Sequence, residues 1–96
     1  MKALIIIPAY NESENLPKLF EALNEVNGEF DIVVINDCSK DNTETVCISK
    51  RIKVITLPVN LGIGGAVQTG YQYALYQNYD IAIQIDGDGQ HDPKFL

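Results

Sequence analysis

The segment Asp86-Gly87-Asp88 places two carboxylates two positions apart, directly after an apolar run of strand length. Side chains at positions i and i+2 of an extended strand point to the same side, so the two carboxylates are expected to converge. Carboxylates that close repel each other unless they share a proton or bind a divalent cation. Because Gln90 can add an amide oxygen, the segment predicts a site for Mg²⁺ or Mn²⁺ with Asp86, Asp88 and Gln90 as ligands.

The remaining polar residues of this segment have simpler interpretations. Asp92 precedes Pro93 and is placed to cap a helix that begins there, a role that fits it better than it fits Asp86 or Asp88. His91 is the only histidine of the chain. Next to a metal loop such a histidine is as often a supporting group as a ligand, so we assign it no catalytic role.

Four apolar runs rich in β-branched residues have the length of strands and end in turn-forming residues: 3–7, 31–35, 53–57 and 81–85. Between them, apolar residues recur with helical spacing over 16–26, 41–50 and 66–75, and the second of these opens with a sequence similar to a capping box. This alternation predicts an α/β fold of order β-α-β-α-β-α-β, with a mainly parallel sheet and helices on both faces.

In open α/β sheets, ligands bind beyond the carboxyl ends of the strands. The four segments at those ends, 8–12, 36–39, 58–65 and 86–91, combine acids or amides with glycine, proline or an aromatic residue. One polar loop is ordinary, whereas four at one edge predict a binding site. Tyr10 can lie against a nucleobase, while Glu12 and Asp37 can accept hydrogen bonds from a base or ribose. The alternatives are a packing aromatic for Tyr10 and a turn residue for Asp37.

The glycine-rich segment 62–65 matches neither familiar phosphate-binding pattern. Val67 stands where a dinucleotide fingerprint has its last glycine, and no Gly-Lys-Ser/Thr follows. The segment either lets backbone approach a ligand closely at the start of the third helix or forms a tight turn. Apart from Lys40, which directly follows the second segment, none of the four loops contains a lysine or arginine. The charge of a bound diphosphate is therefore expected to be met by a carboxylate-held cation.

The composition is that of one small globular domain, with 46% hydrophobic and 21% charged residues in 96. A net charge of -6 argues against a nucleic-acid groove or an anionic membrane surface as the main partner. Cys38 and Cys47 match no CxxC pair or metal set and are expected to be small buried residues in a reducing compartment. The first apolar run is too short for a signal or membrane segment, so we expect a cytoplasmic protein with no transmembrane segment in this chain.

Four motifs in order resemble the inverting glycosyltransferases of family 2, which have the Rossmann-like GT-A fold. They are IIPAYNESENL, VINDCSKDNT, NLGIGGAVQTGYQYA and DGDGQHDP, and they span essentially the whole chain. Each motif is weak alone, whereas the ordered set is specific. The last one is similar to the Asp-x-Asp-x-Gln-His segment of the dolichol- or polyprenyl-phosphate sugar synthases.

The resemblance implies a nucleotide-diphosphate sugar as donor and Mg²⁺ or Mn²⁺ on its diphosphate, held by Asp86 and Asp88 with help from Gln90. It also implies an acceptor such as polyprenyl phosphate, which would bring the full-length protein to the cytoplasmic face of a membrane. The implied substrate-binding residues are Pro8, Tyr10, Glu12, Asp37 and Gly87.

Two departures from the family pattern matter. The family commonly has paired acids after the second strand, and here the first is Asn36. Family domains are also considerably longer than this chain. We therefore expect residues 1–96 to be the N-terminal, nucleotide-sugar-binding part of a single truncated domain, with the acceptor site and any general base beyond Leu96.

Two other functions remain open. In an aspartyl-nucleophile phosphatase, Asp86 would be the nucleophile and Asp88 the acid, although Gln90 replaces the expected threonine and such a motif follows the first strand. A non-catalytic nucleotide- or calcium-binding module would use the alternating oxygen ligands of 86–92, but this loop lacks a glycine at its sixth position. The preferred prediction is metal-assisted sugar transfer with inversion.

Overall fold

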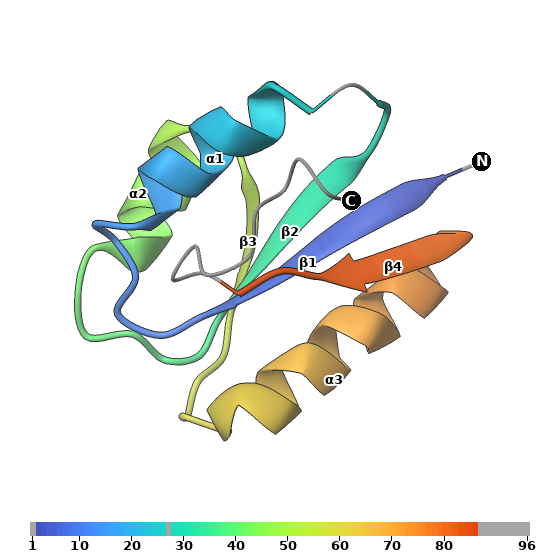
Figure 1. The fold of residues 1–96 in the computed structure, drawn as a ribbon. Helices are drawn as coiled ribbons and strands as arrows, with labels where there is room; N and C mark the ends of the chain where they lie inside the picture. The colour runs from blue at the N-terminus through green and yellow to red at the C-terminus, as the bar shows by residue number, and fades with distance from the viewer. Residues whose placement is uncertain (1, 27, 87–96) are drawn as a thin grey trace.

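The computed structural model describes residues 2–26 and 28–86. Four parallel strands form one sheet in the order β3-β2-β1-β4, and three helices connect them (Figure 1). The predicted α/β class is therefore confirmed. In chain order the elements are β1 (Ala3–Ala9), α1 (Leu16–Asn24), β2 (Asp31–Asn36), α2 (Thr43–Ser49), β3 (Lys53–Thr56), α3 (Gly62–Tyr76) and β4 (Ile81–Gln84).

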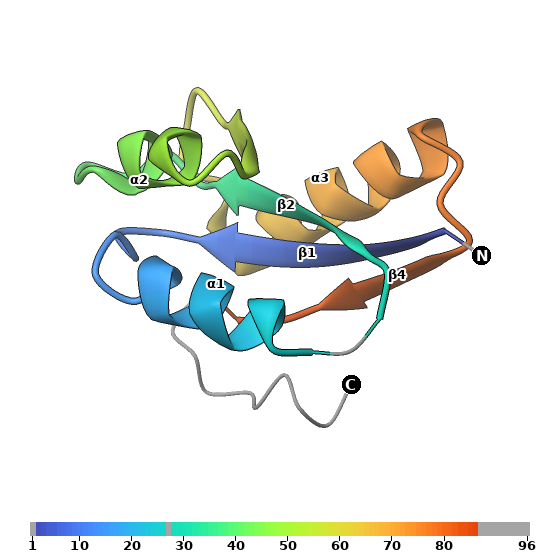
Figure 2. The ribbon, with the colours of Figure 1, turned by 90° about the horizontal axis from the view of Figure 1, so that it is seen from above.

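The sheet lies between two helical layers. Helices α1 and α2 cover one face and α3 covers the other (Figures 1 and 2). Successive residues of β1 alternate between the layers, so that Ile5 and Ile7 pack in the α1 and α2 cluster while Leu4 and Ile6 pack in the α3 cluster. This double burial explains why β1 is apolar at every position rather than at alternate ones.

The registers of the strands set the position of the loops that follow them. β1 pairs with β2 from Leu4 with Asp31 to Ala9 with Asn36, so both strands end at the same level. On the other side of β1, Ala3 to Ile6 pair with β4, and the Ile85 N–H continues the contact by donating to the Ile6 carbonyl (N···O 3.0 Å). The carboxyl ends of three neighbouring strands therefore open onto one edge.

Helix α3 approaches the sheet closely at Gly70. A Cβ placed on Gly70 would lie 2.3 Å from Ile6 Cγ2, closer than two carbon atoms can come. The helix also begins at Gly62, four residues before the predicted 66–75, so the glycine-rich segment forms its first turn rather than a preceding loop. At the start of helix α2 the Asn42 side chain makes no capping hydrogen bond, whereas Oδ1 of the preceding Asp41 accepts the Thr43 N–H (3.0 Å).

The cysteines and the surface complete the description. Cys47 is fully buried as predicted, whereas Cys38 is only partly buried, and both thiols are free.

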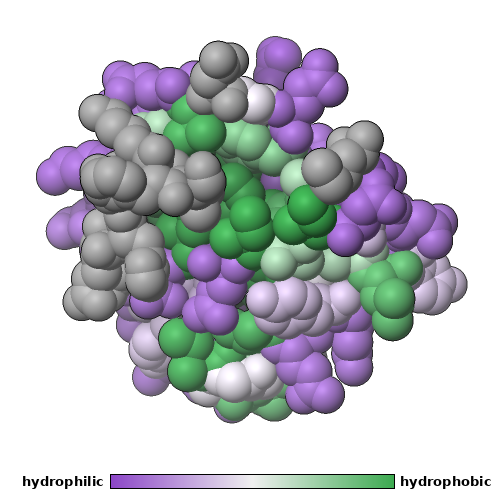
Figure 3. Space-filling view, turned by 45° about the vertical axis from the view of Figure 1, so that its right-hand side comes forward, coloured by the Kyte–Doolittle hydropathy of each residue, from purple (hydrophilic) through white to green (hydrophobic). Residues whose placement is uncertain are grey.

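Figure 3 shows one face with apolar side chains gathered at its middle and hydrophilic ones around much of its margin. Among the described residues, no helix combines the length and apolar character needed to cross a membrane.

Candidate functional site

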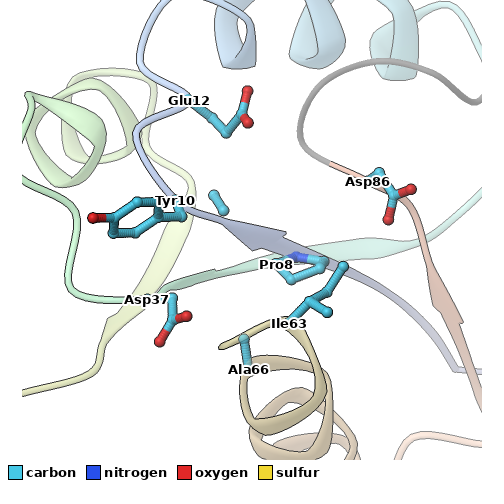
Figure 4. A pocket seen from close by; sticks show the side chains of 8 residues that line it. Pro8, Tyr10, Glu12, Asp37, Ile63, Ala66 and Asp86 are labelled. Atoms are coloured by element: carbon cyan, nitrogen blue, oxygen red, sulfur yellow. The ribbon is translucent and has the colours of Figure 1, made fainter. Parts of the chain in front are cut away.

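A cavity of about 200 Å³ lies at the carboxyl edge of the sheet (Figure 4). Its walls come from the end of β1 and the loop that follows, the residue directly after β2, the beginning of α3 and, two positions beyond β4, Asp86. The lining residues are Pro8, Ala9, Tyr10, Glu12, Asp37, Ile63, Ala66 and Asp86. Residues that are far apart in the sequence thus meet in one pocket, where the parallel topology predicts a ligand.

Five residues predicted from the sequence line this pocket: Pro8, Tyr10, Glu12, Asp37 and Asp86. In Figure 4, Tyr10 and Asp37 lie on one side of the pocket and Asp86 on the other. The other predicted residues, Gly87, Asp88 and Gln90, lie outside the described part of the chain, as do His91 and Asp92.

Asp37 is 4% exposed, and both its backbone and its side chain are held in place. Its N–H donates to the Ala9 carbonyl (N···O 2.8 Å), and its Oδ1 accepts a hydrogen bond from the Leu61 N–H (2.7 Å). The residue therefore connects the ends of β1 and β2 to the start of α3. Asp37 thus holds these elements together and lines the pocket as well.

Asn36, which stands where an acid was expected, has a structural role of its own. Its side chain is buried, its Nδ2 donates to Thr56 Oγ1 (3.3 Å) and its Oδ1 accepts from the Ser39 N–H (3.1 Å). An ionised aspartate could accept the second hydrogen bond but could not donate the first. The amide thus joins β2 to β3 and to its own loop.

The loop after β1 is fastened to the loop after β2. Asn11 has a left-handed backbone (φ 55°); its N–H donates to Ser39 Oγ (3.0 Å), and its Oδ1 accepts from the Lys40 N–H (2.8 Å). Two further hydrogen bonds run from the N–H groups of Glu12 and Ser13 to the side chains of Thr43 and Asp41 at the end of the second loop and the start of α2. The segment between β2 and α2 therefore supports the pocket wall formed by Tyr10 and Glu12.

Glu12 is partly buried at the entrance to α1. Its carbonyl accepts hydrogen bonds from the N–H groups of Asn15 and Leu16 (3.0 Å each), and its Oε2 accepts from Asn15 Nδ2 (2.7 Å). Tyr10 is more open, with 41% of its surface exposed. A flat, accessible ring beside two carboxylates suits a planar ligand that carries hydrogen-bond donors.

Asp86 follows β4 and is partly buried. Its Oδ1 accepts a hydrogen bond from Gln84 Nε2 (3.2 Å). Within residues 2–26 and 28–86, no three His, Cys, Asp or Glu side chains gather as metal ligands. Asp86 is thus the one predicted metal ligand that the structure places, and its oxygens are of the kind that Mg²⁺ and Mn²⁺ prefer.

Sequence reasoning did not single out three of the lining residues, Ala9, Ile63 and Ala66. Ile63 is a large apolar residue between two glycines, and that contrast was the signal available in the sequence. In the structure 64% of its surface is exposed. Ala66 had been placed in the packing stripe of the third helix. Its small side chain is buried at the sheet and borders the pocket as well.

Residues 4–96 match the model of the family described as glycosyl transferase family 2. Undecaprenyl-phosphate mannosyltransferase of Micrococcus luteus is 34% identical over 101 residues, which cover 100% of this chain and 42% of that protein. Polyprenol monophosphomannose synthase of Mycolicibacterium smegmatis is 31% identical over 101 residues, covering 99% of this chain and 38% of that protein. The chain therefore spans less than half the length of these relatives.

Solved structures with the same fold include Staphylococcus aureus TarS in complex with UDP-GlcNAc, with a TM-score of 0.81 and 27% identity over 92% of this chain and 27% of that one. The mannosyltransferase PcManGT of Pyrobaculum calidifontis, in complex with GDP-Man and Mn²⁺, also has a TM-score of 0.81. It is 19% identical over 90% of this chain and 27% of that one, so this second likeness concerns the fold alone.

Proposed function

Because the chain belongs to glycosyl transferase family 2, we propose that it is the donor-binding part of an enzyme that transfers a sugar from a nucleotide-diphosphate sugar to an acceptor. The observation that carries this proposal is the pocket at the carboxyl edge of the sheet. Residues from the ends of β1, β2 and β4 were predicted separately to bind a nucleoside or a metal, and all of those described line this one cavity.

In the proposed complex, Tyr10 lies against the nucleobase, while Glu12 and Asp37 accept hydrogen bonds from its N–H groups or from ribose hydroxyls. The hydrogen bond from the Leu61 N–H fixes the Asp37 carboxylate before any ligand arrives. A fixed acceptor loses little conformational entropy on binding, which favours specific recognition of the nucleoside. Pro8 and Gly87 complete the substrate-binding set.

For the diphosphate, we propose a Mg²⁺ or Mn²⁺ ion held by Asp86, Asp88 and Gln90. When bound, such an ion would neutralise the charge that develops on the departing nucleoside diphosphate. The sequence of the four loops supports this assignment, because apart from Lys40, which directly follows the second loop, they contain no lysine or arginine. The carboxylates of this chain would orient the ion against the diphosphate, on the side of the pocket opposite Asp37.

The names of the relatives support a polyprenyl phosphate as acceptor, which would place the reaction at the cytoplasmic face of a membrane. An oxygen of that phosphate is already anionic, so it needs little activation by a base. It would attack the sugar carbon from the face opposite the leaving diphosphate and invert its configuration. We place the acceptor site and any general base in the part of the protein beyond Leu96.

A thermal-shift panel of UDP, GDP, TDP and CDP tests the donor site, each nucleotide with and without Mn²⁺ or Mg²⁺. We expect one nucleotide to raise the unfolding temperature when a metal is present, and Asp37→Asn to weaken that effect while leaving Leu61 its acceptor oxygen. Binding of Ca²⁺ with no effect of any nucleotide would instead favour a calcium-binding module. A phosphoenzyme mimic trapped by beryllofluoride would favour the phosphatase.

A further inference from the structure

Thr43, the first residue of α2, lies outside the pocket lining but is fully buried, with 0% of its surface exposed. A buried hydroxyl needs hydrogen-bond partners, and Thr43 has them on both sides. Its hydroxyl donates to Asp41 Oδ1, and its Oγ1 accepts a hydrogen bond from the Glu12 N–H (N···O 3.2 Å). Because the hydroxyl has a single proton, the bond to Asp41 turns an oxygen lone pair toward Glu12.

Asp41 extends this contact to the next residue of the first loop. Its Oδ1 also accepts from the Thr43 N–H (3.0 Å), and its Oδ2 accepts from the Ser13 N–H (3.1 Å). Loss of hydration acts to raise the pKa of Asp41, but the hydrogen bonds from Thr43 and Ser13 together outweigh it, so the pKa lies below its ordinary value. The carboxylate therefore stays ionised and acts only as an acceptor.

We propose that Thr43 and Asp41 are positioning residues that place Glu12 at the nucleoside pocket. Two consecutive backbone N–H groups, those of Glu12 and Ser13, are bound by this pair just before α1 begins. Glu12 itself lines the pocket. The pair thus fixes the backbone position from which the Glu12 side chain extends, while Thr43 and Asp41 themselves do not contact the ligand. This inference rests on the proposed function of that pocket.

The test compares three variants in the full-length protein by titrating the nucleotide identified in the panel, with Mn²⁺. Thr43→Val keeps the shape but removes the hydroxyl, and Asp41→Asn replaces an acceptor oxygen with a donor group. We expect each to weaken nucleotide binding at least about fivefold. Thr43→Ser keeps the hydroxyl, so its affinity should stay within about twofold of wild type even though a buried methyl group is lost.

A general loss of stability must be separated from loss of positioning. Tyr79→Phe is the matched control, since it removes a hydrogen bond to Asp31 at the amino ends of the strands, away from the pocket. It should leave the affinity unchanged. In a double-mutant cycle, Asp41→Asn should cost less in a Glu12→Gln background than in wild type, because the carboxylate that it positions is already absent. Equal cost in both backgrounds, or normal affinity of Thr43→Val, would overturn the proposal.

Hydrogen–deuterium exchange gives a readout that does not depend on any ligand. In Thr43→Val and Asp41→Asn, peptides that cover residues 10–16 should exchange faster than in wild type, while Tyr79→Phe leaves them unchanged. If wild type bound no nucleotide, the proposed function would fail. Faster exchange would then still support the positioning contact, and unchanged exchange would overturn it independently.

Discussion

Asn36 and Asp37 are adjacent and both buried, yet their side chains serve different partners. The Asn36 amide donates to Thr56 and accepts from Ser39, whereas the Asp37 carboxylate accepts from Leu61 at the pocket. Only the second of the two residues lines the pocket. The two neighbours thus have separate partners, which a comparison of motifs alone does not reveal.

Tyr79 is a titratable residue whose pKa depends on a hydrogen bond that it donates. Its hydroxyl donates to Asp31 Oδ2 (2.7 Å), and this hydrogen bond, with a smaller contribution from burial, raises the pKa of Tyr79 to about 12. Because the folded pKa lies above the unfolded one, the stabilisation is fully present below about pH 10. It is lost as the pH rises through about 12.

We therefore expect an absorbance titration of the phenols to show one late tyrosine, whose pKa falls toward 10 in Asp31→Asn. Tyr79→Phe serves as the assignment control, because the late step should vanish with that phenol. The chain has five tyrosines, so the step should be about a fifth of the total amplitude. Circular dichroism must show that the protein remains folded over the range; a folded protein with no late step contradicts the expectation.

At the scale of elements, the sequence indicates where the strands lie because β1 and β2 are buried on both faces and read as unbroken apolar runs. The helices are indicated by the spacing of the apolar residues between those runs. It also places the polar strand ends at one edge, since parallel strands share their direction. The hydrogen bonds between the loops could not be predicted. They depend on left-handed backbone at Asn11 and Cys38 and on the register that aligns Ala9 with Asn36, and local sequence patterns specify neither.

The start of α3 at Gly62, before the predicted 66–75, has a related reason. Glycine lowers helix propensity, so Gly62, Gly64 and Gly65 left a tight turn open beside a role at the start of the helix. In the structure, the Asp37 carboxylate accepts the hydrogen bond of the Leu61 N–H just before the helix, and this tertiary contact at the pocket supports its early start. Within the helix, a Cβ on Gly65 would come within 2.5 Å of Leu61 Cβ, so a glycine suits this position.

Helix α3 offers a matched pair of substitutions. Gly70→Ala would force a Cβ against Ile6, and overpacking of this kind costs about 1–3 kcal/mol of unfolding free energy. Gly64→Ala adds the same methyl group where no atom lies within 4 Å, and it should stabilise the helix by about 0.5–1 kcal/mol. Urea denaturation measures both. If the two variants changed stability in the same direction, the close packing of α3 on β1 would not be the cause.

At the scale of the whole molecule, the charge of the chain bears on the proposed binding of the donor. The chain carries a net charge of -6, and Glu12, Asp37 and Asp86 all line the pocket. A nucleoside diphosphate is itself an anion, so without a cation its phosphates would face carboxylates of the same sign. The nucleoside part has no such charge, and in the proposed complex it would meet the pocket through stacking and hydrogen bonds.

This difference predicts that removal of the metal lowers the affinity for the nucleoside diphosphate more than the affinity for the nucleoside. With EDTA, the affinity for the nucleoside diphosphate should fall at least about tenfold, as expected when a charge is left without its counterion. The affinity for the corresponding nucleoside should change less than about twofold. Asp88→Asn should reproduce the effect of EDTA on the diphosphate, because it removes a proposed ligand charge without changing the size of the side chain. Calorimetric titration of both ligands distinguishes the outcomes: an equal loss for nucleoside and diphosphate would mean that the metal maintains the fold of the pocket, and no loss for either would remove the metal from donor binding.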